Sequence, residues 1–280
     1  MSEAFSINED MDQATLERVI KAVHLFTGIT ITEQKKTMLQ SRLRRRMREL
    51  KIAHYSDYMD FLDKTAGEKQ GFIDVMTTNE TFFFRTPRIW EYFQKTYLPE
   101  WASQNPKSTL KIWSAASSSG EEAYSIAISC QELQDRHPGF EYSIGGSDIS
   151  SEVLKEAKAG EYFEKSVEFM KRSKMELFEK HFQTKEEGMY EISSKLKQKV
   201  KFQAHNLFGI KKDQYDIIFL RNVLIYFSSE DQEIVLRNIS RSLKEDGILI
   251  IGESESLNRL ETPFEFKSAC IYTLAKKKDK

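Results

Sequence analysis

The chain has 280 residues, of which 40% are apolar and 30% charged, with a net charge of −1, a composition typical of globular proteins with one or two domains. Its apolar runs, such as Ile248–Gly252, are far shorter than the ~18 residues that a membrane-spanning helix needs, and the polar stretch Met1–Asp12 lacks the pattern of a secretory signal. Two cysteines in apolar segments and five histidines without metal-ligand spacing lead us to expect a cytoplasmic chain with reduced thiols, no bound metal and no membrane insertion.

The first 85 residues predict a domain made of helices only. Apolar residues recur at helical spacing from Leu16 to Phe26, and Gly28 follows as a C-terminal cap. A second helix is expected from Thr32 to Leu50, and a third is capped by Ser56 and stopped by Gly67. A short fourth helix follows, and nothing in this region alternates as a strand does.

The second of these helices is strongly basic. Between residues 35 and 51 the sequence has eight basic residues against one acid, and apolar residues from Leu39 to Leu50 occupy one face. We expect Arg42, Arg45 and Arg46 to lie together on the exposed side. This side is either an ordinary solvated surface or a docking surface for an acidic partner. Binding of nucleic acid is less favoured, because no aromatic residues accompany the arginines.

From Thr86 onward strands alternate with helices, which is typical of an α/β domain with a mainly parallel sheet and helices on both faces. Thr86-Pro87 is a good helix start, because proline at the first helical position gives up no hydrogen bond. The stretches 264–266 and 269–275 have strand composition with no helix between them, so we expect an antiparallel hairpin at one edge of the sheet. The expected strands are 110–115, 142–148, 201–206, 215–222 and 248–253, and the expected helices are 121–135, 150–158 and 229–243.

The segment from about 161 to 199 interrupts this alternation. It predicts a short helix at Met175–Phe182 and then a hairpin that turns at Gly188. We therefore expect a helical domain over residues 1–85, followed by an α/β domain over 86–280 that carries a small antiparallel insertion.

Ligands of open parallel sheets bind beyond the carboxyl ends of the strands, so the residues that follow each strand are candidates for a site. The first strand leads into a run of small residues around Ala115, which lets a ligand approach the backbone at a helix start. A dinucleotide site would need several glycines. This loop has one glycine and then Glu121 and Glu122, which would repel a phosphate and suit an amino group or hydroxyls. Alternatively, the two acids only complement the helix dipole.

The ends of the next strands carry further polar residues. Asp148 is placed to accept hydrogen bonds from ribose hydroxyls, although the Asp-Ile-Ser sequence is also an ordinary lead into a helix. Asn206 and Leu207 could offer an amide and an apolar lid to a purine ring. Arg221 and Asn222 follow an apolar strand, where an arginine needs an anionic ligand or a structural salt bridge.

Outside the sheet, segment 78–85 joins a polar cluster to three consecutive phenylalanines and an arginine. Three phenylalanines in a row cannot all face one core from a helix. We therefore expect the segment to wedge between the two domains and to present Asn79, Thr81 and Arg85 to the cleft. An aromatic plug between the domains would explain the phenylalanines but not the polar residues.

Taken in order, four motifs resemble the chemotaxis receptor glutamate methyltransferases, the CheR family: TNETFFFR at 78–85, IWSAASSSGEEAYS at 112–125, Asp148, and FLRNVLIYF at 219–227. The resemblance covers nearly the whole chain. It implies a Rossmann-like S-adenosylmethionine-dependent methyltransferase domain, an all-helical N-terminal domain and an inserted β-subdomain. It further implies methyl ester formation on chemoreceptor glutamates, with S-adenosylhomocysteine as the other product. The expected cofactor contacts are Asn79, Thr81, Arg85, Ala115, Glu121, Asp148, Asn206, Leu207, Arg221 and Asn222.

Within this resemblance, Arg85 and Tyr226 are expected to orient the acceptor carboxylate, which is ionised at neutral pH and needs no general base. The basic face at Arg42, Arg45 and Arg46 is expected to dock on the acidic helical bundle of the receptor's cytoplasmic part. Some family members bind a receptor pentapeptide through a G-x-G-x-x-x-R loop. Residues 187–190 lack that motif, so we do not expect this tether. We expect a monomer. Two alternatives remain: a methyltransferase acting on RNA or a small molecule, and a non-catalytic cofactor-sensing scaffold.

Overall fold

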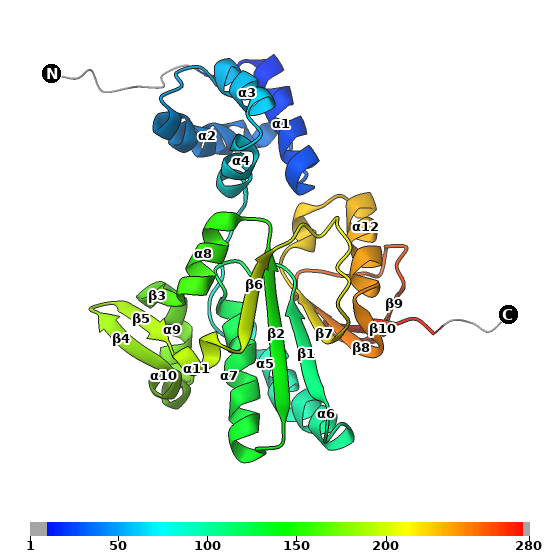
Figure 1. Cartoon of the computed structure of the whole chain (residues 1–280). Helices are drawn as coiled ribbons and strands as arrows, with labels where there is room; N and C mark the ends of the chain where they lie inside the picture. The colour runs from blue at the N-terminus through cyan, green and yellow to red at the C-terminus, as the bar shows by residue number, and fades with distance from the viewer. Residues whose placement is uncertain (1–9, 277–280) are drawn as a thin grey trace.

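The computed structural model describes residues 10–276, so most of the polar stretch predicted at 1–12 lies outside the described residues. A helical domain sits above a larger α/β domain, and a small insertion projects from one side of the α/β domain (Figure 1). Among the described residues no helix is long and apolar enough to cross a bilayer. Both cysteines are free, with Cys130 buried and Cys270 half-buried.

The N-terminal domain is entirely helical, as predicted. Asp12 caps the first helix by accepting a hydrogen bond from Thr15 N, and Gly28 closes it with a left-handed backbone (φ 75°). The expected cap at Ser56 is wrong, because the third helix already starts at Tyr55 and ends at Lys64, before Gly67. The elements are α1 (Gln13–Thr27), a 3-10 turn η1 (Glu33–Lys35), α2 (Lys36–Leu50), α3 (Tyr55–Lys64) and α4 (Glu68–Met76).

The α/β domain is built on a seven-stranded sheet with the order β6-β2-β1-β7-β8-β10-β9. The first five strands in this order run parallel, and the last two form the predicted antiparallel hairpin at the edge. The strand order reverses at β1 and β7, where α/β sheets bind ligands. The strands are β1 (Thr109–Ser114), β2 (Glu141–Asp148), β6 (Val200–Ala204), β7 (Tyr215–Leu220), β8 (Leu243–Ile251), β9 (Phe264–Ser268) and β10 (Ile271–Leu274).

Both faces of this sheet are covered by helices. Alternate residues of β7 belong to separate apolar clusters, with Ile217 and Phe219 on one face and Ile218 and Leu220 on the other. The first face packs against α5 (Pro87–Tyr92), the π-turn η2 (Phe93–Tyr97), α6 (Leu98–Gln104) and α7 (Glu121–Arg136), and the second packs against α12 (Ser229–Ser240). The helix predicted to reach Leu243 ends at Ser240, because Leu243 already pairs with Tyr215 as the first residue of β8.

The insertion forms a separate three-stranded sheet of order β3-β5-β4 after α8 (Ser151–Ala159). Its hairpin turns at Gly188 with a φ of 75°, as expected from the sequence, while its first strand and the following helix were not predicted. The elements are β3 (Glu161–Phe163), α9 (Glu164–Ser173), α10 (Met175–His181), β4 (Phe182–Glu186), β5 (Met189–Ile192) and α11 (Ser194–Lys197).

The three phenylalanines do not wedge between the two domains, which corrects that expectation and also excludes the alternative of an aromatic plug there. Phe83 and Phe84 are fully buried in the core of the α/β domain, where Phe83 packs edge-on against Tyr162 and Phe182 of the insertion. Only Phe82 remains partly exposed. Segment 78–85 therefore packs the insertion against the sheet through Phe83. The polar residues of the segment face the pocket described below.

Candidate active site

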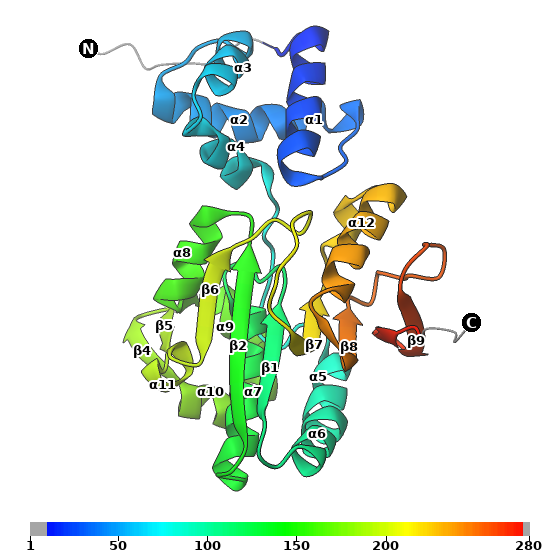
Figure 2. The same cartoon turned by 45° about the vertical axis from the view of Figure 1, so that its right-hand side comes forward.

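A pocket of about 970 Å³, counted out to its open mouth, lies where the parallel strands end beneath the helical domain. The arrowheads of β1, β2 and β6 in Figure 2 point toward that domain. The site residues predicted from the sequence that line this pocket are Asn79, Thr81, Arg85, Ala115, Asp148, Asn206, Leu207, Arg221, Asn222 and Tyr226.

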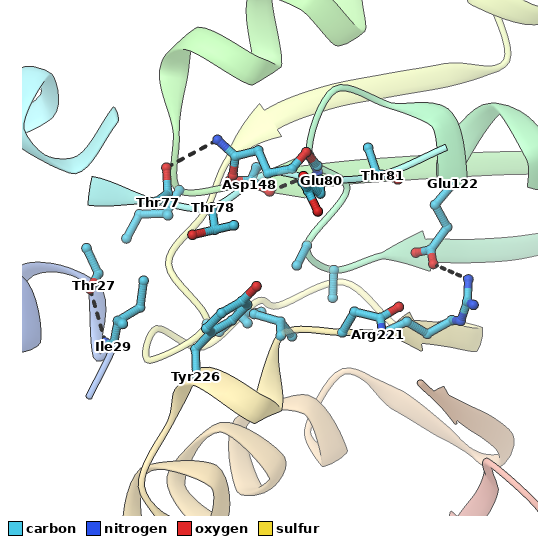
Figure 3. Close-up of a pocket in the computed structure, with 18 of the residues that line it drawn as sticks. Thr27, Ile29, Thr77, Thr78, Glu80, Thr81, Glu122, Asp148, Arg221 and Tyr226 are labelled. Atoms are coloured by element: carbon cyan, nitrogen blue, oxygen red, sulfur yellow. Dashed lines mark hydrogen bonds and ion pairs between the residues drawn. The ribbon is translucent and has the colours of Figure 1, made fainter. Parts of the chain in front are cut away.

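Part of the pocket wall comes from the helical domain, which the sequence did not indicate. Thr27 and Ile29, at the end of α1, line the cavity opposite the strand ends (Figure 3). Two hydrogen bonds fix this wall, from Thr30 N to Tyr226 O at 2.9 Å and from Asn206 Nδ2 to Phe26 O at 3.3 Å. The residue pattern of α1 indicated only an apolar face and a cap.

A buried ion pair forms one end of the pocket. Arg221 Nη1 lies 2.9 Å from Glu122 Oε2, and the two side chains are only 2% and 12% exposed. Arg221 Nη2 also donates to Arg85 O at 2.9 Å, whereas its Nε has no hydrogen-bond partner among the described residues. Ser114 Oγ donates to Glu122 as well. Arg221 therefore forms the structural salt bridge considered for it, and it also lines the cavity.

Of the two adjacent acids, Glu122 lines the pocket, whereas Glu121, the acid expected to contact the cofactor, does not. Glu121 is 2% exposed and accepts hydrogen bonds from Ser119 Oγ and from Ser166 Oγ of α9 in the insertion. Burial raises its pKa above the ordinary value. Successive residues in a helix point about 100° apart, and here Glu121 points to Ser119 and Ser166 while Glu122 faces the cavity.

Asp148 stands at the end of β2 with its carboxylate held by the backbone. Its oxygens accept hydrogen bonds from Ser118 N at 2.9 Å and Ser150 N at 3.0 Å. Burial raises its pKa, while these N–H groups act in the opposite direction by favouring the ionised form. A carboxylate has about four lone-pair positions, so Asp148 can still accept hydrogen bonds from hydroxyls in the pocket.

Segment 77–85 forms a second wall. Ser118 Oγ donates to Asn79 O at 3.0 Å and so ties this wall to the loop after β1. Phe84 and Thr86 have left-handed backbones, with φ 56° and 68°, and the sharp turn leaves the Arg85 side chain in the pocket lining. Arg85 Nη1 donates to Glu80 O at 3.1 Å, and no carboxylate pairs with it among the described residues.

The third wall is the loop after β7. Figure 3 shows the ring of Tyr226 projecting into the cavity with its hydroxyl directed away from the ribbon. His205, which the sequence analysis did not select, also lines the pocket beside Asn206. Burial and the nearby Lys211 lower the pKa of His205, so the ring is neutral near pH 7.

The basic face of α2 is smaller than expected, because two of its three arginines are engaged within the domain. Arg46 donates to both oxygens of the buried Glu68, at 2.9 and 2.7 Å. Arg42 donates to Met76 O and to Thr78 Oγ1, beside the pocket wall formed by segment 77–85. Arg45, with a side chain 60% exposed, forms a single surface ion pair within residues 10–276, with Glu152 of α8.

A second, more open groove lies between α2 and α8. Arg42 and Arg45 contribute to one side, and Glu152 and Glu156 to the other. Thr77 and Asn79 line both this groove and the main pocket, so the two cavities meet at the segment that joins the domains.

Comparison with known proteins gives matches over both domains. The family model for the CheR methyltransferase SAM-binding domain matches residues 79–273, and the model for the CheR methyltransferase all-alpha domain matches residues 14–77. The chain is 31% identical over 271 residues to the chemotaxis protein methyltransferase of Escherichia coli, covering 95% of this chain and 92% of that protein. Proteins of the same name from Borreliella burgdorferi (32% identity; 90% and 92% covered) and Vibrio parahaemolyticus (37%; 85% and 87%) are similar over most of their length.

The two family models divide the chain between residues 77 and 79, at the segment where the helical domain meets the pocket. The SAM-binding model contains the carboxyl ends of all five parallel strands, most of the wall formed by segment 77–85, and the wall formed by the loop after β7. From these matches and from the fold, the chain belongs to the CheR family of methyltransferases.

Proposed function

We propose that this protein transfers the methyl group of S-adenosylmethionine to glutamate side chains of chemoreceptors, giving glutamate methyl esters and S-adenosylhomocysteine. The observation that carries the proposal is that the acids Glu122 and Asp148 and the candidate acceptor-orienting residues Arg85 and Tyr226 line one cavity. The relatives named chemotaxis protein methyltransferases support the same conclusion.

The polar groups that line the pocket fit this cofactor. Asp148 has lone pairs left for ribose hydroxyls, and Glu122 offers a carboxylate to the amino group of the methionine part. The buried Nε of Arg221 has no hydrogen-bond partner among the described residues, so it can donate to a hydrogen-bond acceptor on the bound cofactor. Asn206 and Leu207 remain the residues that we assign to the adenine ring. When bound, S-adenosylmethionine supplies an electrophilic methyl group on a positively charged sulfur.

The chain's own contribution to the reaction is mainly geometric. A glutamate carboxylate with a pKa of about 4.3 is already ionised at neutral pH, so no side chain has to remove a proton. Alignment of the reacting groups can supply roughly 7–11 kcal/mol. Arg85 can hold the acceptor carboxylate through two N–H groups and Tyr226 through one hydroxyl. A very tight grip would stabilise the unreacted anion, so we assign modest orienting roles to both residues.

We assign the docking surface to Arg45 and the groove between α2 and α8. Because this groove shares Thr77 and Asn79 with the cofactor pocket, a helix lying along α2 could present a side chain to the pocket. An acidic helical bundle, such as the cytoplasmic part of a chemoreceptor, complements exposed arginines. Attraction between exposed charges of this kind is screened by salt. We propose that one copy of the chain acts on the receptor.

One assay separates this proposal from its alternatives. Purified protein is incubated with S-adenosylmethionine labelled on the methyl group and with membranes that carry chemoreceptors. Base treatment should release the label from the receptor as methanol, and an Asp148→Asn control should release little. Label recovered in RNA or in a small molecule would favour the alternative substrates. A protein that binds the cofactor but transfers no label would favour a non-catalytic sensor.

A further inference from the structure

The loop that follows β8 holds the loop that follows β7 through a single side chain, Glu255. Its Oε2 accepts hydrogen bonds from Asn222 N at 2.9 Å and from Gly252 N at 2.6 Å. Its Oε1 accepts hydrogen bonds from Val223 N at 2.9 Å and from Leu224 N at 2.8 Å. Three of these four donors are consecutive residues of the loop that lines the pocket.

This carboxylate satisfies backbone groups that the loop cannot satisfy itself. Asn222 has a left-handed backbone (φ 59°), and the residues after it form only a single 3-10 turn, η3 (Leu224–Tyr226). Their N–H groups therefore have no strand or helix partner. Successive N–H groups that converge in this way form an anion-binding concavity. Here the anion is a side chain of the protein.

The close approach depends on Gly252. A Cβ atom at this position would lie 2.8 Å from Glu255 Oε2 and 2.9 Å from Asn222 Nδ2, which is closer than real Cβ atoms come to other heavy atoms. Burial raises the pKa of Glu255, while the four N–H groups favour its ionised form. The absence of a side chain at Gly252 leaves room for the Glu255 carboxylate, and the four converging N–H groups favour its negative charge.

We propose that Glu255 is a positioning residue for methyl transfer, which sets the wall of the pocket at the acceptor end. Glu255 does not line the cavity itself, but Asn222, Val223 and Tyr226 on the loop that it holds do. Through η3, the position of the Tyr226 ring depends on where Glu255 holds the backbone of Asn222, Val223 and Leu224. This inference rests on the proposed role of Tyr226 in orienting the acceptor carboxylate.

The test compares Glu255→Gln with a matched control in the same loop. The substitution keeps the side-chain shape but turns an NH₂ group toward two of the four donors. Glu253→Gln is the control, because Glu253 is exposed and forms no side-chain hydrogen bond within residues 10–276. Misplacement of an orienting group by about 1 Å can cost about 100-fold in rate, so we expect Glu255→Gln to lower kcat about 10- to 100-fold. Its affinity for S-adenosylhomocysteine should change much less, and Glu253→Gln should match the wild type.

A second comparison tests whether the effect passes through Tyr226. In a Tyr226→Phe background no hydroxyl is left to misplace, so Glu255→Gln should cost clearly less there than in the wild type. Glu255→Asp, which keeps the charge on a shorter side chain, should give an intermediate kcat and serves if Glu255→Gln does not fold. Equal losses in both backgrounds, or an unchanged kcat in both Glu255 variants, would overturn the proposal. A wild-type protein that methylates another acceptor would refute the proposed function alone, because the same comparison can be made with that acceptor.

Discussion

The two adjacent acids at the start of α7 give a sharp test of the site, because they differ in what they face. Glu122 pairs with Arg221 at 2.9 Å in the pocket, while Glu121 accepts hydrogen bonds from Ser119 and from Ser166 of the insertion. We predict that Glu122→Gln weakens both cofactor binding and stability, and that Glu121→Gln leaves cofactor binding nearly unchanged. The substitutions are chemically identical and one residue apart, so each controls for the other.

The expected size follows from the burial of the pair. Glutamine keeps an oxygen that can accept from Ser114 Oγ or Arg221 but removes the charge that balances a guanidinium only 2% exposed. A hydrogen bond to a charged group contributes about 1.5–3 kcal/mol, so we expect a stability loss of that order. If Glu122 also binds the cationic amino group of the cofactor, the same range corresponds to a roughly 10- to 150-fold rise in the dissociation constant.

Calorimetric titration with S-adenosylhomocysteine and urea unfolding without ligand measure the two effects separately. Glu121→Gln should keep its affinity within about threefold of the wild type, a difference below about 0.7 kcal/mol. Equal weakening by both substitutions would show that the choice of Glu122 over Glu121 is wrong. Normal binding by Glu122→Gln would show that the ion pair with Arg221 is structural only.

Four further outcomes are expected. Asp148→Asn should weaken binding of S-adenosylhomocysteine about tenfold or more, measured by calorimetry, because hydrogen bonds to a carboxylate are stronger than those to an amide. Arg46→Ala should lower the free energy of unfolding by about 3–5 kcal/mol, because it leaves the carboxylate of Glu68, only 3% exposed, without its cationic partner. Arg45→Ala should leave stability unchanged and instead raise the KM for receptor in low salt. Tyr226→Phe should lower kcat about tenfold without a matching change in cofactor affinity, measured by steady-state kinetics and calorimetry; orienting hydrogen bonds have effects of about this size. The raised pKa of Glu121 means that the folded protein takes up a proton more readily than the unfolded chain. Its contribution to stability is therefore largest below the unfolded pKa of about 4.3 and is lost as pH rises through the folded pKa, so Glu121→Gln should flatten that part of the pH–stability curve measured by urea unfolding.

Most of the fold could be predicted because its signals are local. The order of strands and helices follows from apolar patterns in short windows. Gly28, Pro87 and Gly188 mark a helix end, a helix start and a hairpin turn by their own backbone preferences. The antiparallel edge hairpin followed from the absence of a helix between two strand-like stretches. The strand β3 was missed because three residues, Glu161–Phe163, are too few to show an alternation.

The site could be predicted less completely, because its chemistry depends on pairs that are distant in the sequence. The choice between Glu121 and Glu122 depends on Arg221 and Ser166, which the sequence does not place. Arg46 reads as an exposed residue of a basic helix until Glu68, 22 residues later, is brought beneath it. Helical periodicity gives the direction of a side chain, but it does not show what that side chain meets.

The part of the pocket around Tyr226 depends on both domains at once. Tyr226 lies on a loop whose N–H groups are held by Glu255 of the α/β domain, while its own carbonyl accepts a hydrogen bond from Thr30 of the helical domain. Phe208 closes the same interface by packing over Gly28, where a Cβ would lie 2.1 Å from its ring. The helical domain therefore contributes directly to the wall of the pocket. Under the proposed function, a bound receptor that shifted this domain would move Tyr226 as well, so we expect docking and alignment of the acceptor to be linked.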